Sequence, residues 1–222
     1  MSGPDSKEAP MEAEQIARAR ESAGFTRTRA ADLLGVAPRT LARWESGSQT
    51  PSPASRAALR ALFASYDGSD EAAMAEALRL ARLAAAVGET PVGCVIVSDG
   101  RIVGRGRNRR ERDRSALAHA EIEAIGEACR TLGGWRLWRA SLYVTLEPCP
   151  MCAGAIVNAR IPRVYFGARD PKGGSCGSVC DLFSMPYNHR PAAASGLMEA
   201  ESAALLRDFF RSLREKKVGN FR

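Results

Sequence analysis

The chain has 222 residues, of which 45% are hydrophobic and 26% charged, enough for one large domain or two small ones with a buried core. No stretch is long and apolar enough to span a bilayer, and the opening MSGPDSKEAP lacks the apolar region of a signal peptide, so we expect a cytoplasmic protein without membrane contacts. The net charge of +7 favours a polyanionic partner.

The N-terminal part of the chain is predicted to be helical. Residues 1–11 are polar and contain Pro and Gly, so we expect a disordered tail. Over residues 12–65, alanine-rich helical segments are interrupted by Gly- and Pro-containing breaks, which predicts a small all-α bundle. Residues 66–70 are predicted to be a linker.

Strand-like and helical segments alternate over residues 71–217, and residues 218–222 are a basic tail. The strands are expected at Val92–Val97, Arg101–Gly106, Leu142–Leu146 and Val164–Phe166. The helices are expected from Ser69 or Asp70 to about Val87, and at Ala118–Leu132, Pro150–Ala159 and Met198–Lys216. The turn at residues 98–100 would join the first two strands into a hairpin. Strands alternating with helices indicate an α/β fold, a three-layer α/β/α sandwich around a central sheet.

The helix expected at Ala118–Leu132 carries apolar residues at helical spacing, which form an apolar face. They are Ile122, Ile125, Cys129 and Leu132. Cys94 and Cys129 are interpreted as small core residues, and the scattered cysteines favour a reducing compartment.

Two short clusters carry most of the chemistry. One is His119-Ala120-Glu121, and the other contains Cys149 and Cys152. One imidazole and two thiolates are suitable ligands for a tetrahedral zinc ion, and they leave the fourth position for water. Cysteines three apart at a helix start have both sulfurs on one face, where the thiolate form is favoured. Residues two apart diverge on a helix, so we expect His119 and Glu121 in a first turn, where directions are less constrained.

Glu121 is the candidate for moving the proton. Zinc lowers the pKa of a bound water from about 15.7 toward roughly 7. Glu121 would take the proton, hydroxide would attack an electron-poor ring carbon, and Glu121 would deliver the proton to the ring nitrogen and the departing ammonia. The residues therefore predict a hydrolytic zinc enzyme.

A structural zinc site or a redox pair is the alternative interpretation of the two cysteines. A structural site would need a fourth protein ligand, which His189 could supply only if its loop folds back, and it would give Glu121 no role. Cys176 and Cys180 have no histidine close by in the sequence, so packing is favoured over a second metal.

The order His-x-Glu, then Pro-Cys-x-x-Cys, resembles that of the cytidine-deaminase superfamily. Within this superfamily, about residues 70 to 217 resemble the tRNA-specific adenosine deaminases. The segments that carry the closer resemblance are Thr90–Cys94, Asn108, Leu142–Ala155, Phe166–Lys172, Asn188–Arg190 and Ala204–Arg211.

The resemblance implies that the enzyme converts adenosine to inosine at the wobble position of a tRNA anticodon, mainly in an arginine tRNA, as a homodimer. The zinc ligands that it implies, for one Zn²⁺ per subunit, are His119, Cys149 and Cys152. It implies that Glu121 is the proton shuttle and that Asn108 hydrogen-bonds the flipped base or its ribose. It also implies that Asp170 and Asn188 contact the anticodon loop, whose splayed bases a pocket can bind.

The chain departs from the family pattern close to these residues. Residues 115–118 are Ser-Ala-Leu-Ala, where the family usually has an aspartate and a threonine, and residues 85–88 lack an aromatic and an arginine often found there. Arg107 stands where the family often has an aromatic residue. These departures concern substrate contacts and leave the metal ligands intact.

Two basic segments stand out from the rest of the sequence. Residues 101–114 contain seven arginines, and residues 207–222 contain six basic residues. Such segments are usually solvated faces. Because the first one leads directly into the metal cluster, it favours phosphate binding near the active site.

Residues 15–63 resemble a helix-turn-helix of the Cro/repressor type. Residues 25–36 resemble its first helix and turn, and residues 37–47 its second helix. A core is expected from Leu33, Leu34, Val36, Leu41 and Trp44. Arg39, Thr40 and Arg43 are then left for DNA binding. Contacts to tRNA, to the other subunit or to another protein remain equally open.

Two other functions remain open at this point. A deaminase of a free base or nucleoside, such as guanine or cytosine, would share the signature, but it would need a closed pocket and gain nothing from the basic segments. A DNA-binding regulator could use a deaminase-like fold to sense a purine, but it would not need Glu121. The sequence therefore favours a tRNA adenosine deaminase with an appended helix-turn-helix.

Overall fold

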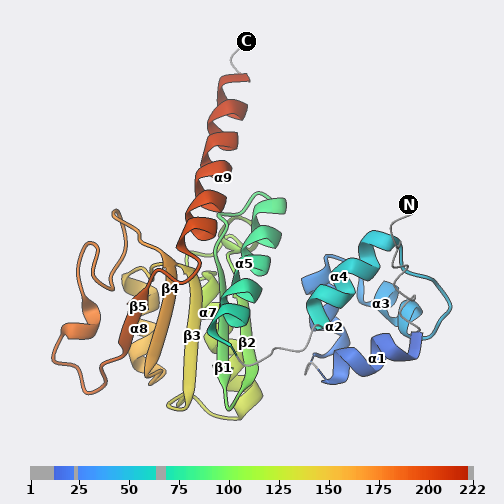
Figure 1. Ribbon diagram of the computed structural model, residues 1–222, viewed down its shortest axis with the longest axis horizontal. Coiled ribbons are helices and arrows are strands. Elements are labelled where there is room, and N and C mark those ends of the chain that lie inside the picture. Colours follow the sequence, from blue (N-terminus) through green and yellow to red (C-terminus); the bar gives the residue numbers. More distant parts are fainter. Residues whose placement is uncertain (1–12, 23–24, 64–68, 220–222) are drawn as a thin grey trace, which may run out of the picture. The chain divides into compact units, whose positions relative to one another are not determined.

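The computed structural model of the chain describes residues 13–22, 25–63 and 69–219 (Figure 1). The chain divides into two compact units, residues 1–65 and 66–222. The tail expected at residues 1–11 lies outside the described residues, as do residues 66–68 of the expected linker and residues 220–222 of the basic tail.

The first unit is the all-α bundle that the sequence predicts. Its helices are α1 (Ala13–Ser22), α2 (Arg27–Leu34), α3 (Pro38–Glu45) and α4 (Pro53–Phe63). The side chain of Thr26 caps α2 by accepting a hydrogen bond from the Arg29 backbone N–H, and α2 ends at Gly35, whose φ of +69° suits a residue without a Cβ. Pro38 then opens α3 in the first turn, where its missing N–H costs nothing.

The core of this unit lies between the four helices. Its buried apolar residues include Ile16, Leu33, Leu41, Trp44 and Leu59. Of the core residues expected from the sequence, Leu34 and Val36 are only partly buried. They lie at the end of α2 and in the turn, where one side of the chain faces water.

A buried carboxylate at the end of α3 ties this unit together. Glu45 accepts from the Arg20 guanidinium at 2.5 Å and from Arg27 at 2.8 Å, and only 4% of its side chain is exposed. Arg20 also donates to the Phe25 carbonyl at 2.8 Å. Burial raises the pKa of Glu45, but the hydrogen bonds from the two arginines outweigh this effect and leave that pKa below its ordinary value.

We expect this carboxylate to make the first unit sensitive to acid. Because the folded-state pKa of Glu45 is depressed, its contribution to stability is present above the unfolded-state pKa and is lost as pH falls through the folded-state pKa. Glu45→Gln should therefore lower the unit's stability at pH 7 by about 1.5–3 kcal/mol, the usual range for charged hydrogen bonds. Thermal unfolding followed by Trp44 fluorescence, with Trp135 and Trp138 changed to Phe, checks this.

Glu14→Gln is the matched control for the acid experiment. Glu14 pairs with Arg18 at 3.2 Å, but both side chains are at least 75% exposed, so this pair contributes little. An equal acid-induced loss of stability in the wild type and in Glu45→Gln would contradict the assignment.

The second unit is built on a five-stranded mixed sheet of order β2-β1-β3-β4-β5. The strands are β1 (Gly93–Ser98), β2 (Arg101–Arg107), β3 (Ala140–Leu146), β4 (Arg163–Ala168) and β5 (Ala192–Ser195). β1 pairs antiparallel with β2 and β3, whereas β3, β4 and β5 run parallel. Asp99 and Gly100 both have positive φ in the turn between β1 and β2, so the predicted hairpin is confirmed.

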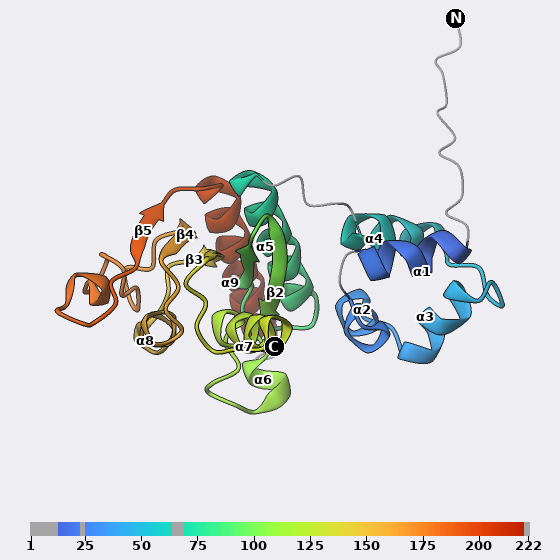
Figure 2. The same cartoon turned by 90° about the horizontal axis from the view of Figure 1, so that it is seen from below.

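Helices cover both faces of this sheet, so the predicted three-layer α/β/α sandwich is confirmed (Figure 2). α5 (Asp70–Ala86) and α9 (Glu199–Gly219) lie on one face, and α7 (Ala120–Leu132) and α8 (Pro150–Asn158) on the other. α5 is capped by the Ser69 side chain, which accepts from the Ala72 N–H at 3.0 Å. None of the described helices combines the length and hydropathy needed to cross a membrane.

Three short elements were not expected from the sequence. They are α6 (Arg110–Asp113), the 3-10 helix η1 (Leu182–Ser184) and β5. β5 is an edge strand of small, exposed residues, so it has no alternating pattern. The sequence of α6 is charged throughout, and such a segment resembles a solvated loop.

α7 approaches the sheet most closely through its alanines, while Ile125 and Cys129 of the predicted apolar face are partly buried against the same core. Ala120, Ala124 and Ala128 are fully buried, whereas Leu132 is 46% exposed. The strand opposite them explains the difference. A Cβ added at Gly106 would lie 1.9 Å from the Ala120 carbonyl oxygen, so the helix and strand backbones are too close for larger side chains.

We expect Gly106→Ala to lower the free energy of unfolding by at least 1–3 kcal/mol, because an overpacked core must shift the helix away from the strand. Gly134→Ala is the control, since a Cβ there would meet no atom within 4 Å and its φ is not positive. Urea unfolding of both variants measures the difference. Equal stability of the two variants would show that α7 moves without cost.

Candidate active site

The start of α7 and the start of α8 bring the two predicted clusters together. His119 is the residue that precedes α7, and its φ of −84° and ψ of 151° are extended. Because His119 is outside the helix and Glu121 is its second residue, both side chains can point to the same side. Cys149 holds the equivalent place before α8, and Cys152 lies in the first turn. β3 ends at Leu146, three residues before Cys149, so the end of this strand brings the cysteines close to His119 at the start of α7.

The three predicted ligands form one compact group. The His119 Nδ1 atom lies 3.6 Å from the Cys149 Sγ and 3.5 Å from the Cys152 Sγ. Tetrahedral zinc with bonds of about 2.0 Å to nitrogen and about 2.3 Å to sulfur separates such atoms by about 3.5 Å. The donor set therefore fits zinc. Among the described residues this group has three members, which leaves the fourth tetrahedral position open.

Hydrogen bonds distribute the charge in this group. The bond from the Cys152 thiol lowers the pKa of Cys149 to about 4, although partial burial opposes the effect. The bond to Cys149 and burial together raise the pKa of Cys152. The bond to Cys149 also raises the pKa of His119. The group thus favours the thiolate form of Cys149, which is the form that binds a metal ion.

Glu121 lies beside the group in a dry environment. Its side chain is 4% exposed, and burial raises its pKa to about 7. A carboxyl group with this pKa can both take and return a proton near neutral pH.

A pocket of about 160 Å³ opens over these residues. Its lining consists of Thr90, Val92, Asn108, Arg110, His119, Ala120, Glu121, Leu146, Glu147, Cys149 and Asp170. The structure thus places Asn108 and Asp170 in the same pocket lining as Glu121. Asn188 lies elsewhere, on an exposed loop, where its Oδ1 accepts from the Arg160 guanidinium at 2.5 Å.

Glu147 organises the loop beside the pocket, and sequence reasoning missed it. Its buried carboxylate accepts from the backbone N–H groups of Asp170, Cys176 and Ser178 at 3.0–3.1 Å, and from the Ser178 hydroxyl. Burial raises the pKa of Glu147, but these hydrogen bonds lower it further, so that the net shift is downward. Its position directly before Pro148 and the metal-ligand cysteines was the available signal.

Glu89 is a second buried carboxylate that was missed. It accepts from the backbone N–H groups of Glu111 at 3.3 Å and Arg112 at 2.8 Å, and the Asn108 side-chain amide donates to it at 3.5 Å. Only 1% of Glu89 is exposed. It therefore fixes both the start of α6 and one end of the Asn108 amide.

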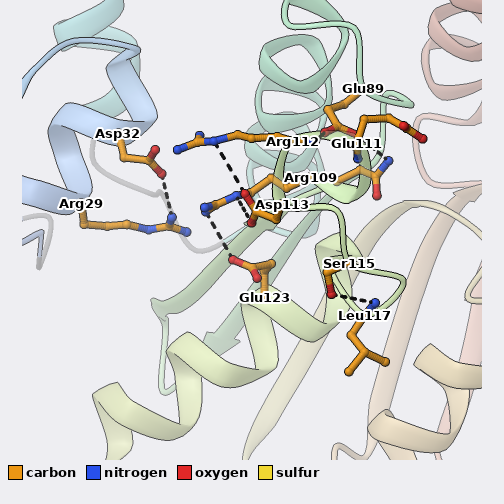
Figure 3. Close-up of polar contacts among 11 residues, drawn as sticks. Arg29, Asp32, Glu89, Arg109, Glu111, Arg112, Asp113, Ser115, Leu117 and Glu123 are labelled. Atoms are coloured by element: carbon orange, nitrogen blue, oxygen red, sulfur yellow. Dashed lines mark hydrogen bonds and ion pairs between the residues drawn. The ribbon is translucent and has the colours of Figure 1, made fainter.

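Most arginines of the first basic segment have structural partners. Arg105 pairs with Glu76 at 2.9 Å, and Arg109 pairs with Asp113 at 3.1 Å and Glu123 at 3.5 Å (Figure 3). Arg107 is 8% exposed. The segment as a whole is thus not a free basic face.

The other candidate metal-binding residues lie outside the group. His189 Nε2 is 2.8 Å from the Ile161 carbonyl oxygen. Cys176 and Cys180 join no metal-binding group among the described residues, and all six cysteines are free. The structural-site interpretation thus gains no fourth ligand.

In the first unit, the residues named for DNA binding lie on α3. Arg39 and Arg43 are exposed and four residues apart, whereas Thr40 is partly buried. Their helix faces the core through Leu41 and Trp44, so the two guanidinium groups occupy its other side.

Comparison with known proteins gives the family of each unit. The MafB19-like deaminase family matches residues 68–214, and a helix-turn-helix family matches residues 16–55. The tRNA-specific adenosine deaminase of Bacillus subtilis (strain 168) is 50% identical over 149 residues, which are 67% of this chain and 92% of that protein. That of Agrobacterium fabrum (strain C58 / ATCC 33970) is 52% identical over 139 residues, 62% of this chain and 91% of that protein.

A solved structure supports the same assignment. It comes from a study of A-to-I editing by tRNA:A34 deaminases at the wobble position of transfer RNA, and it is 51% identical to this chain. The match covers 60% of this chain and 98% of the solved one, with a TM-score of 0.59. The chain therefore belongs to the tRNA-specific adenosine deaminases, and it carries a helix-turn-helix in addition.

Proposed function

We propose that this protein deaminates the wobble adenosine of a tRNA anticodon to inosine, with an arginine tRNA as its main substrate. The observation that carries the proposal is a buried carboxyl group, Glu121, beside a zinc-type ligand group in the pocket of a chain that is 50% identical to a tRNA-specific adenosine deaminase. The reaction adds water at C6 of the base, breaks the C6–N bond and releases ammonia.

The residues of the pocket divide the work. One zinc ion per subunit, held by His119, Cys149 and Cys152, would supply a water of lowered pKa at the open position. Glu121 takes the proton of that water and returns it to the ring nitrogen and then to the departing amino group. Asn108, held at one end by Glu89, binds the base or its ribose.

Two further contacts to the anticodon loop are proposed. Asp170 lines the pocket, and its Oδ1 accepts from the Lys172 backbone N–H at 2.9 Å, which fixes the carboxylate. Asn188 is on an exposed loop away from the pocket lining, so it would contact a neighbouring nucleotide instead of the reacting base.

The direct test is inosine formation in unmodified arginine tRNA with adenosine at the wobble position. Free adenosine, guanine and cytidine are run in parallel. Inosine in the tRNA alone supports the proposal. Turnover of a free base or nucleoside alone would assign the enzyme to salvage, and no turnover with zinc bound would favour a regulator that senses a purine.

A second proposed function is DNA binding through α3. Arg18, Arg20, Arg27 and Arg29 of the first unit are all engaged by carboxylates, whereas Arg39 and Arg43 make no ion pair with any described residue. Unpaired guanidinium groups four apart on the second helix of a helix-turn-helix suit the major groove or its phosphates.

The double change Arg39→Ala/Arg43→Ala tests DNA binding, with Arg18→Ala as the exposed, ion-paired control. We expect weaker, less salt-dependent binding of duplex DNA and unchanged deamination. Thr40→Ala tests a direct contact of its hydroxyl. DNA binding that the double change leaves intact would move the site away from α3.

Two architectural proposals accompany these functions. We propose a homodimer, to be measured by sedimentation equilibrium. We also propose that residues 12–65 and 71–217 are independently folded domains joined by residues 66–70. Limited proteolysis should then cut first between the two domains and leave a fragment with the zinc ligands.

A further inference from the structure

The charge of the pocket lining is uneven. Three carboxyl groups line it, those of Glu121, Glu147 and Asp170, but only one guanidinium does, that of Arg110. A neutral base or nucleoside offers no negative charge that a guanidinium could bind. A nucleotide within a strand does, because a phosphate flanks its base on each side.

Arg110 differs from three of the arginines close to it. Arg105 forms an ion pair with Glu76, and Arg109 and Arg112 form ion pairs with Asp113. Arg110 is exposed and makes no ion pair with any described residue. Its charge is therefore available at the pocket, whereas the charges of its neighbours are used within the fold.

The backbone that carries Arg110 is fixed on both sides. On one side the Arg109 N–H donates to the Ala118 carbonyl at 3.0 Å, and the Arg109 guanidinium is held by Asp113 and Glu123. On the other side, Glu89 accepts from the next two backbone N–H groups (Figure 3). The position of Arg110 relative to the pocket is thus set before any substrate binds.

We propose that Arg110 binds a phosphate adjacent to the reacting nucleotide and thereby makes the enzyme prefer an RNA strand over a free nucleoside. The carboxyl groups of the lining disfavour a phosphate beside them, because like charges repel. It can lie at Arg110, which binds phosphate by paired, charge-assisted hydrogen bonds. This inference rests on the proposed function, since it concerns the same site.

Arg110→Ala is the first variant, and Arg101→Ala is its control from the same basic segment. Arg101 is also exposed but does not line the pocket. With an anticodon stem-loop as the RNA, we expect Arg110→Ala to raise KM about tenfold with kcat nearly unchanged. The slope of log(kcat/KM) against log salt should become shallower by about 0.7–0.9, the amount for one lost phosphate contact. The KM of Arg110→Lys should lie between those of the wild type and Arg110→Ala, since lysine keeps the charge but cannot form the paired hydrogen bonds.

The phosphate itself is tested by replacing the linkage 5′ or 3′ of the target adenosine with a neutral methylphosphonate. One of the two should weaken binding to the wild type but have no further effect on Arg110→Ala. Additive effects at both linkages, or a fall in kcat at unchanged KM and salt slope, would overturn the proposal.

Binding is also measured by fluorescence anisotropy with a stem-loop whose target base is a non-reacting purine. That readout does not depend on turnover. Failure of the proposed deamination would appear as wild type without inosine, whereas failure of the Arg110 contact would appear as binding that Arg110→Ala leaves intact.

Discussion

Glu121→Gln will keep the fold and the zinc but lower kcat for inosine formation by about 10²–10⁴-fold, the usual contribution of general acid–base catalysis. Glutamine has nearly the same shape as glutamate, so the buried site at the start of α7 should stay packed. It cannot take a proton from water, and this is the role that the burial and raised pKa of Glu121 favour. Single-turnover rates on tRNA, with zinc measured by mass spectrometry, give both quantities.

Glu123→Gln is the matched control for this experiment. Glu123 is on the same helix turn and accepts from Arg109 at 3.5 Å, but it does not line the pocket. We expect its kcat to stay within about threefold of the wild type, since a part-exposed ion pair contributes little. Full activity of Glu121→Gln would remove Glu121 from the mechanism. Loss of zinc from that variant would instead make it a structural residue of the metal site.

Cys152→Ser will weaken zinc binding by more than about 100-fold, beyond the effect of losing a residue that only supports a ligand. Cys152 is fully buried, and its Sγ lies 3.5 Å from the His119 Nδ1, so no other cysteine can replace it without moving α8. A hydroxyl group stays protonated where a thiol becomes a thiolate ligand. We expect substoichiometric zinc and no measurable inosine, and added zinc should restore only part of the activity.

Cys180→Ser makes the same chemical change outside the ligand group and serves as the control. It should keep one zinc per chain and normal turnover. Removing zinc from the wild type with a chelator should abolish activity, and adding zinc back should restore it. Normal zinc content in Cys152→Ser would show that the metal has other ligands.

The sequence predicts the candidate zinc ligands because the spacing of the two cysteines within one short motif is itself typical of a metal site. Cys149 and Cys152 are close in the chain, and the structure adds only the long-range contact to His119. The sandwich is also predictable, since its strands and helices are long enough to show their periodicity. Asn108 and Asp170 line the pocket in the structure, but they were inferred from a family resemblance and not from spacing.

The remaining features could not be predicted because each depends on a tertiary contact. In the sequence, Glu89 looks like a surface carboxylate, because only the folded α6 brings its backbone N–H groups to it. Arg110 is one of seven similar arginines in its segment. The alanine contact of α7 could not be predicted because the backbone approach at Gly106 excludes large side chains, which are the usual sign of a core face. Asn188 lies outside the pocket lining, so its predicted contact to the anticodon loop stays a prediction.

The arrangement of the ligands on two helix starts also constrains the order of folding. His119 and Cys149 are 30 residues apart, and between them lie all of α7 and the strand that must pair with β1. An unfolded chain can offer the metal two neighbouring thiols, but the imidazole arrives only when this long loop closes. We therefore expect tight capture of zinc to be a late event in folding. We expect the protein without zinc to fold but to be less stable, because three native ligands gain more from the ion than two thiols of the unfolded chain.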